Sequence, residues 1–157
     1  MADLRIRALS AADADAAASL IREAFAAQSL ATDPPSSALR ETATSVAAHL
    51  AEGGGAALES GGALVGVALW AERDGGLYLG RLAVLPEWRG RGGARALIAA
   101  AETEARRRAL PRLHLRVRLA LEENRRLFSA RGFTPTGEGA HPGYAEPTFL
   151  RMEKALR

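Results

Sequence analysis

The chain has 157 residues, a formal net charge of +3 and no cysteine, and a chain of this length can bury roughly two-thirds of its unfolded surface in one core. The lack of cysteine excludes disulfides, thiolate metal ligands and a cysteinyl acyl intermediate. The N-terminus has no basic leader before an apolar run, and no stretch approaches the ~18 apolar residues of a membrane span. We therefore expect one cytoplasmic domain over residues 1–157.

The positive charge does not by itself indicate a nucleic-acid partner. Lys154 is the only lysine, and the arginines are spread along the chain beside abundant alanine. No aromatic-rich strand or known nucleic-acid-binding module accompanies them. A basic nucleic-acid-binding module is therefore the weakest alternative for the function.

Alternation and helical spacing predict the elements of the first half. Apolar and basic residues alternate in "LRIRAL" (residues 4–9), as in a half-buried strand, and Ser10 stands where a helix N-cap is expected. Glycine pairs then separate three short apolar runs, which predicts an antiparallel meander. In order, we expect one strand, two helices and three strands over residues 4–9, 10–25, 39–50, 56–59, 63–71 and 77–85.

The second half continues with a long helix and a strictly alternating strand. "LHLRVRL" (residues 113–119) places four apolar residues on one face and His114, Arg116 and Arg118 on the other. A short helix ends at Gly132, a typical C′ glycine. The predicted helix, strand, helix and two strands span residues 92–109, 113–119, 123–130, 133–136 and 148–154, with a loop over 137–147. This order predicts an α/β (α+β) fold, a mixed, largely antiparallel central sheet flanked by helices.

The segment "PEWRGRGGARAL" (residues 86–97) places a glycine-rich turn between a predicted strand and a predicted helix. Free backbone N–H groups and the positive end of the helix dipole converge at such a turn, and glycine lets an anion approach the backbone. The segment lacks the lysine and the hydroxyl residue of an ATP- or GTP-binding loop. It has Arg95 where the dinucleotide fingerprint has its third glycine. An anion site of another kind is therefore predicted.

Arg89, Gly92 and Ala94 instead match the pattern R/Q-x-x-G-x-G/A. With the preceding "LAVLPEW", this stretch resembles the GCN5-related N-acetyltransferase (GNAT) family, whose loop binds the pyrophosphate of coenzyme A. A predicted strand followed by "ENRRLFSARGF" (residues 123–133) resembles the second CoA-side motif of the family. The predicted element order is also that of the family, so the resemblance covers essentially the whole chain.

The resemblance implies that the chain binds acetyl-CoA as cosubstrate, without a metal, and passes the acetyl group directly to a primary amine. The backbone of Leu82, Ala83 and Val84 would pair with the pantetheine arm. The Val84 N–H would face the thioester carbonyl, where one preorganised donor can contribute roughly 3 kcal/mol. The pyrophosphate would lie in the turn, and the residues implied there are Arg89, Gly90, Arg91, Gly92, Gly93 and Ala94. Arg89 would either add charge or support the turn.

Three further residues are compared with the family pattern. Asn124 stands where the family often has an asparagine that contacts the pantetheine, and a helix N-cap is the alternative of equal weight. Phe128 departs from the family, which commonly has a tyrosine there to protonate the leaving thiolate. Because a thiol with a pKa of about 8.5 leaves a tolerable thiolate, the loss of this acid should slow the reaction without preventing it. Phe128 would then pack against the CoA arm, and Tyr144 or Tyr78 would be the candidate acid.

The sequence singles out no general base. His114 and His141 are the candidates, with a structural role as the alternative for each. The histidines are too scattered for a metal site. Arg116 and Arg118 are expected either to bind an acidic acceptor or to be partly solvated strand residues.

The acceptor stays open among a polyamine, an amino acid, an aminoglycoside-like drug and a protein N-terminus. Its specificity is expected to lie in two loops, residues 29–37 and 139–147, where sequence carries little readable code. The main alternative function is a catalytically weak or inactive acyl-CoA-binding sensor. No membrane partner is expected, and a homodimer is suggested by family analogy alone.

Overall fold

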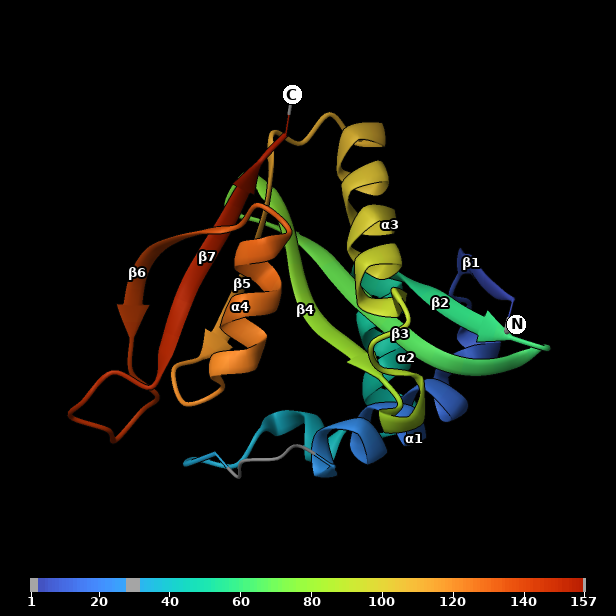
Figure 1. The fold of residues 1–157 in the computed structure, drawn as a ribbon, viewed down its shortest axis with the longest axis horizontal. Coiled ribbons are helices and arrows are strands. Elements are labelled where there is room, and N and C mark those ends of the chain that lie inside the picture. The colour runs from blue at the N-terminus through green and yellow to red at the C-terminus, as the bar shows by residue number, and fades with distance from the viewer. Residues whose placement is uncertain (1–2, 28–31, 157) are drawn as a thin grey trace.

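The computed structural model describes residues 3–27 and 32–156. In chain order its elements are β1 (Leu4–Ala8), η1 (Ala11–Asp13), α1 (Ala14–Ala26), η2 (Ser37–Arg40), α2 (Ala43–Glu52), β2 (Gly54–Ser60), β3 (Ala63–Arg73), β4 (Gly76–Val84), η3 (Pro86–Trp88), α3 (Gly93–Arg107), β5 (Arg112–Arg118), α4 (Glu122–Ala130), β6 (Thr134–Gly139) and β7 (Phe149–Ala155), where η marks a short 3-10 helix. Figure 1 shows their arrangement. No helix in the described ranges is long and apolar enough to cross a membrane.

The strands of the described residues form one seven-stranded sheet in the order β1-β2-β3-β4-β5-β7-β6. Every neighbouring pair is antiparallel except β4 and β5, which are parallel. The predicted fold class, a mixed and largely antiparallel sheet flanked by helices, is confirmed. The predicted meander of β2, β3 and β4 is also confirmed, because each strand pairs with the next.

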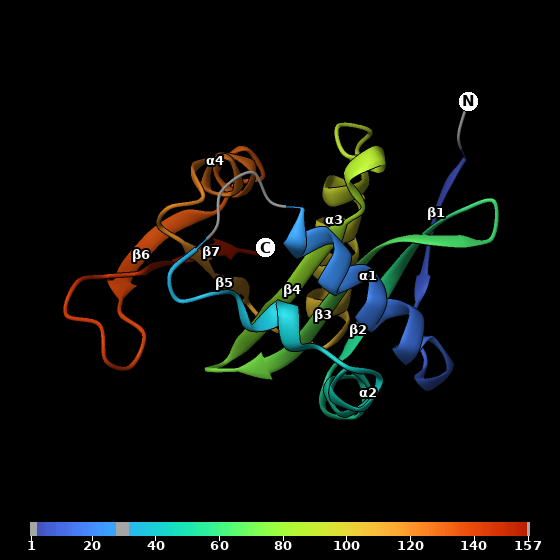
Figure 2. The same cartoon turned by 90° about the horizontal axis from the view of Figure 1, so that it is seen from below.

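Helices cover both faces of the sheet, α3 and α4 on one side and α1 and α2 on the other (Figure 2). Alternation along β3 supplies both cores, since Val67 and Leu69 pack with α1 and α2. Ala68 and Trp70 point to the opposite face and pack with α3. A strand buried on both faces needs a continuous apolar run, and the sequence of β3 has one.

Several predicted boundaries differ from the structure, and two of these differences have a clear physical reason. Leu39 lies in η2 and is 40% exposed, while α2 begins only after Thr42, whose side chain accepts the Ser45 N–H. The strand β6 continues to Gly139, three residues into the predicted loop, because these residues pair with β7. The pairing with β7 outweighs the weak strand preference of the two glycines in this segment.

The site is positioned by a separation of β4 from β5. The two strands pair only at Leu77 with Leu113 and at Tyr78 with His114. Two residues further along β4, Gly80 has no partner on β3. Leu79 pairs with Trp70 and Arg81 pairs with Leu69, so Gly80 forms a β-bulge. Beyond this bulge β4 and β5 diverge toward the lower part of Figure 1.

Candidate functional site

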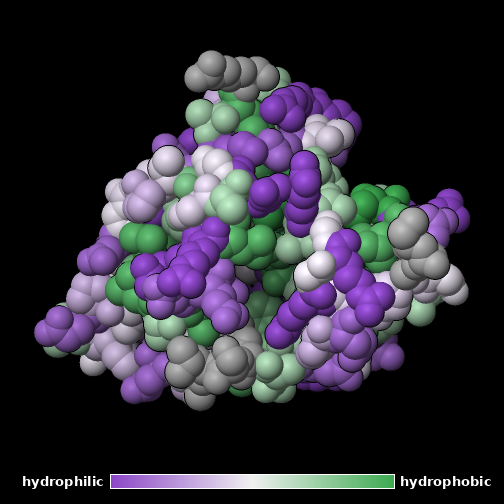
Figure 3. All heavy atoms as spheres, viewed as in Figure 1, coloured by the Kyte–Doolittle hydropathy of each residue, from purple (hydrophilic) through white to green (hydrophobic). Residues whose placement is uncertain are grey.

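A cavity of about 760 Å3 opens where β4 and β5 part. The end of β4, the turn into α3 and the helix α4 form its walls, and Figure 3 shows a hollow with an apolar floor and hydrophilic flanks on this face. We refer to it as the large cavity. The predicted site residues that line it are Leu82, Ala83, Val84, Arg89, Gly90, Gly92, Gly93, Ala94 and Asn124.

The backbone of β4 presents hydrogen-bonding groups to the large cavity. The Leu85 N–H donates to the Val65 carbonyl at 2.9 Å across the β3–β4 pair. Antiparallel pairing alternates the direction of backbone groups along a strand, so Ala83 directs its N–H and C=O toward β3. Leu82 and Val84 direct theirs toward the gap beside β5. An extended, amide-containing chain in this gap would therefore pair with Leu82 and Val84 as an added strand does.

The turn into α3 offers free N–H groups to the same cavity. Gly92 is the N-cap with a φ of 84°, and Gly90 has a φ of 75°, values that favour glycine. The first intrahelical hydrogen bond runs from the Ala96 N–H to the Gly92 carbonyl at 3.0 Å. The N–H groups of residues 93–95 thus have no acceptor within the helix. Together with the helix dipole, they make this end of the cavity suited to an anion.

Arg89 joins three segments at the edge of the large cavity. Its Nε donates to the Val84 carbonyl at 3.2 Å, and its Nη2 donates to the Ala24 carbonyl at 2.9 Å. Both acceptors are backbone groups, one at the end of β4 and one near the end of α1. Of the two roles that the sequence leaves open, this geometry favours support of the turn.

Asn124 is the third residue of α4, and Leu121 is the N-cap. The N-cap alternative for Asn124 is therefore wrong, and its side chain borders the cavities instead. At the other end of α4, Gly132 has a φ of 95°. The Phe133 N–H donates to the Phe128 carbonyl at 3.0 Å, which completes the predicted glycine-terminated helix end.

Of the described residues, three that were predicted for the site do not line the large cavity. Arg91 stacks on the Trp88 ring at 4.8 Å. Phe128 is 8% exposed and packs edge-on against Phe133, with 5.6 Å between ring centroids. Tyr144 is 37% exposed and donates its hydroxyl to Asp33 at 2.6 Å, and this hydrogen bond raises the pKa of Tyr144.

A second cavity of about 240 Å3 adjoins the first. Both are lined by Phe25, Leu82, Leu121 and Asn124, so a molecule in this small cavity would lie next to one held along β4. The small cavity is lined by Phe128 and Tyr78, and by residues from both loops that were predicted to set specificity, namely Ser36, Ser37 and His141. Residues 29–31 of the first loop lie outside the described residues.

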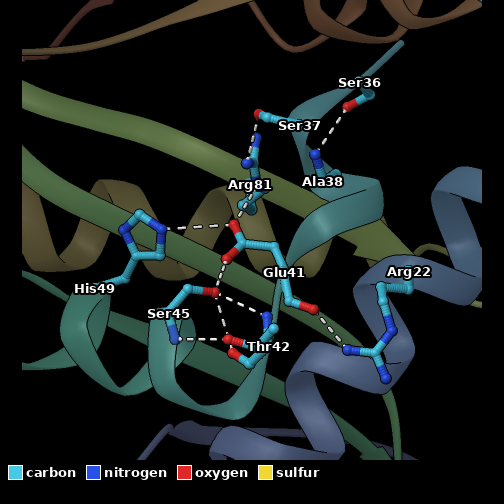
Figure 4. A network of polar contacts seen from close by, with 9 residues as sticks. All are labelled: Arg22, Ser36, Ser37, Ala38, Glu41, Thr42, Ser45, His49 and Arg81. Atoms are coloured by element: carbon cyan, nitrogen blue, oxygen red, sulfur yellow. Dashed lines mark hydrogen bonds and ion pairs between the residues drawn. The ribbon is translucent and has the colours of Figure 1, made fainter.

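A buried carboxylate behind the small cavity was not predicted from the sequence. Glu41 is 4% exposed, and its Oε2 accepts Arg81 Nε at 2.8 Å while Oε1 accepts the Ser45 hydroxyl (Figure 4). Burial raises the pKa of Glu41, but the hydrogen bonds from Ser45 and Arg81 outweigh it and leave the pKa below its ordinary value. Arg81 also donates to Ser37 at 2.8 Å. The only sequence signal was an arginine within the apolar run of β4.

The two candidate histidines differ in position. His114 Nε2 donates to the Arg73 carbonyl at 2.8 Å, and burial lowers its pKa. His141 lines the small cavity and contacts the Thr148 hydroxyl through Nδ1. Burial, and then the positive charges of Arg118 and Arg116, lower the pKa of His141. Within the described residues, His141 is therefore the histidine placed to act on a molecule in the small cavity.

The site thus combines an extended backbone edge with an anion-binding helix start, inside a mixed sheet of this strand order. The family model "Acetyltransferase (GNAT) family" matches residues 18–133, more than half of the chain. The chain belongs to this family.

Solved structures of the same fold match nearly the whole chain. The PaiA N-acetyltransferase of Thermoplasma acidophilum, in complex with coenzyme A, has 18% identity and a TM-score of 0.80, with 98% of this chain and 99% of that chain covered. The YncA putative acetyltransferase of Salmonella typhimurium, with acetyl-CoA, has 21% identity and a TM-score of 0.74, covering 99% and 95%. The ribosomal-protein-S18-alanine N-acetyltransferase of Escherichia coli has 19% identity and a TM-score of 0.76, covering 98% and 94%.

At these identities the likeness shows a shared fold. Among curated proteins, none matches the sequence significantly.

Proposed function

We propose that this protein is an acetyl-CoA-dependent N-acetyltransferase, which passes the acetyl group directly to a primary amine held in the small cavity. One observation carries the proposal: the free backbone edge at Leu82 and Val84 and the anion-binding start of α3 line one continuous cavity. The family membership and the two neighbours whose structures hold coenzyme A or acetyl-CoA support it.

The residues of the large cavity fit this cosubstrate. The pantetheine arm is extended and rich in amides, which suits pairing with Leu82 and Val84. The pyrophosphate suits the N–H groups at the start of α3, with Gly90, Arg91, Gly92, Gly93 and Ala94 forming the turn around it. The Asn124 side chain would contact the arm from α4, and Arg89 would hold the turn in place.

Acetyl-CoA supplies an acetyl group activated as a thioester. The attack of an amine on a thioester places negative charge on the carbonyl oxygen, and the Val84 N–H faces the gap in which that oxygen would lie. One preorganised donor of this kind contributes roughly 3 kcal/mol to the transition state. The donor is fixed because its neighbours in β4 are paired to β3.

The acceptor must lose a proton before or during its attack. His141 is the group that we assign to this task, because it lines the small cavity and its lowered pKa favours the neutral imidazole. In the described residues the lining of the large cavity includes no tyrosine. Tyr78 is the candidate acid that remains, because it lines the adjoining small cavity. Without it the thiolate would leave unaided, which is slower and still feasible for a thiol with a pKa of about 8.5.

The first test is the binding of acetyl-CoA by calorimetry. The wild type should bind more tightly than ~1 mM, or about −4.1 kcal/mol, and Gly92→Glu should abolish binding by placing a carboxylate at the pyrophosphate. Gly62→Glu is the matched control, since Gly62 also has a positive φ, 81°, and open space around it, but lies in the β2–β3 hairpin. Retained affinity in Gly92→Glu would contradict the assignment of the turn.

The second test is thiol release from acetyl-CoA across a panel of amines. Release that depends on an amine, with a matching acetylated product, is the expected result. Tight binding of acetyl-CoA without release by any amine would favour the alternative of an acyl-CoA sensor, for which the replacement of the usual tyrosine by Phe128 is the supporting observation. No binding at all would leave the basic nucleic-acid-binding module as the alternative.

A further inference from the structure

The small cavity has an unbalanced charge. Within the described ranges, its lining contains the arginines Arg81, Arg116 and Arg118 together with His141, and no aspartate or glutamate. Positive groups that converge on a partly enclosed cavity create a potential that favours an anion. An anion could bind only to those arginines whose guanidinium groups are not already paired with a carboxylate.

Arg81 is already neutralised. Its Nε is bound to the buried Glu41 carboxylate at 2.8 Å, and its Nη2 is bound to Ser37. Removal of either charged partner would leave the other uncompensated. Arg81 is thus a structural part of the wall, and the excess charge comes from Arg116 and Arg118 of β5.

Arg116 and Arg118 lie two residues apart on β5 and so share one face of the sheet. In the part of the chain that the structure describes, neither has a carboxylate within 4.0 Å. The Arg116 guanidinium stacks on the Phe149 ring at 4.6 Å. Stacking occupies the flat face of a guanidinium and leaves its N–H edge available for a carboxylate.

Arg118 is held from the other side of the cavity. Its Nη1 donates to the Pro34 carbonyl at 2.6 Å, and burial lowers its pKa while the nearby Asp33 carboxylate raises it. Asp33 compensates this charge only in part, since its carboxylate acts from a distance and forms no ion pair with Arg118 within 4.0 Å. A guanidinium has five N–H groups, so Arg118 retains donors beyond those that bind carbonyls.

We propose that the acceptor is an amine that also carries a carboxylate, and that Arg116 and Arg118 bind this carboxylate in the small cavity. The inference rests on the proposed function, because it names the acceptor class of the same site. A guanidinium matches a carboxylate with two parallel hydrogen bonds. A polyamine would instead bring further positive charge to two arginines that, among the described residues, have no carboxylate within 4.0 Å, so polycationic acceptors are disfavoured.

The test uses straight-chain ω-amino carboxylates from glycine to 6-aminohexanoate, each paired with its primary amide. Calorimetry on the protein saturated with CoA measures binding without turnover. At the spacer length that fits, the carboxylate should bind at least about tenfold more tightly than its amide, since charge-assisted bonds are roughly twice as strong as neutral ones. Arg116→Gln should reduce this preference to within about twofold, which is the loss expected when one partner of a bidentate pair is removed.

Arg151→Gln is the matched control. Arg151 pairs with Arg116 across the β5–β7 register, is exposed and also stacks on the Phe149 ring, at 5.3 Å. It is not among the described residues that line the small cavity. A local carboxylate site predicts that Arg151→Gln keeps the preference for the acid. An equal loss in both variants would show a general effect of charge and would overturn the proposal.

A second measurement needs no variant. The charges of Arg118 and Arg116 contribute to the lowered pKa of His141, so a bound carboxylate should raise the pKa of His141, measured by NMR titration of the CoA-saturated protein with and without the amino carboxylate. An unchanged pKa, or equal binding of acid and amide, would overturn the proposal. A preference for the acid without thiol release would leave the carboxylate site standing and contradict the transferase. Thiol release with acids and amides alike would support the transferase and contradict the carboxylate site.

Discussion

The two adjoining cavities are built in different ways. The large cavity offers mainly backbone groups from one short segment, residues 82–95, which runs from the free edge of β4 to the start of α3. The small cavity offers side chains from segments far apart in the sequence, including Ser37, Arg81, Arg116 and His141. Recognition by backbone groups depends on a local sequence of glycines and a strand end. Recognition by side chains depends on which loops the topology brings together.

The largest effect expected in the comparison is on catalysis at Val84. Val84→Pro removes the N–H that faces the gap, and because this group is directed away from β3, no sheet hydrogen bond is lost with it. We expect kcat to fall by about 100-fold, as for other single oxyanion donors. The affinity for acetyl-CoA should fall less, because Leu82 still pairs with the pantetheine arm. Steady-state kinetics and calorimetry measure the two quantities.

Val84→Ala is the control for this variant, because it shortens the side chain and keeps the N–H. If Val84→Pro folds and retains the kcat of Val84→Ala, the donor on the large-cavity side is another group. The large cavity would then not stabilise the transition state through the backbone N–H of Val84.

The sequence allowed the glycine turn of the large cavity to be predicted because the parts of this turn are contiguous. Glycine spacing, a strand before it and a helix after it are local features, and the structure places Gly90 and Gly92 in the left-handed region that such a turn needs. The order of strands and helices could be predicted for the same reason. The bulge at Gly80 could not, since it depends on the exact register between β3 and β4. The parting of β4 and β5 could not either, since these strands pair residues more than thirty positions apart.

The small cavity was harder to predict because its residue types have common structural uses. Arg81 and Glu41 are forty residues apart, and nothing local indicates that they form one buried pair. Tyr144 illustrates the same difficulty. Its place in a loop near the end of the chain made it a candidate acid, but in the structure its hydroxyl donates to Asp33. Loop residues acquire their role from tertiary contacts, which local periodicity does not encode.

The replacement of Glu41 should have an intermediate effect, which is on the stability of the fold. Glu41→Gln removes the charge that compensates Arg81 at a site 4% exposed, and we expect the free energy of unfolding to fall by about 2 kcal/mol, less than for a fully buried pair because Arg81 is partly solvated. Urea denaturation measures it. Glu59→Gln, which breaks the exposed pair with Arg7, should change the stability by less than about 0.5 kcal/mol.

The double variant Glu41→Gln/Arg81→Gln sharpens this prediction. If the two residues act as a pair, the double variant should be less destabilised than the sum of the single variants. Additive effects would show that Glu41 stabilises the wall of the small cavity through its other partners, Ser45 and His49, and that Arg81 is not held by it. The excess charge of the small cavity would then include Arg81.

The smallest expected effect is the change of stability with pH that depends on His141 in the small cavity. Burial lowers the pKa of His141 and of His114 below the ordinary value of a histidine, so the folded protein binds fewer protons than the unfolded chain between the lowered values and about 6.5. Stability therefore rises with pH across this window: the contribution is present above about 6.5 and is lost as the pH falls through the folded pKa. Urea denaturation at pH 7 and pH 5 should show a smaller loss in His141→Gln than in the wild type, with the remaining loss reflecting His114 and the carboxylates. An equal or larger loss in His141→Gln would mean that neither burial nor the charges of Arg118 and Arg116 lower the pKa of His141. The small cavity would then lack the focused positive potential on which its preference for an anion depends.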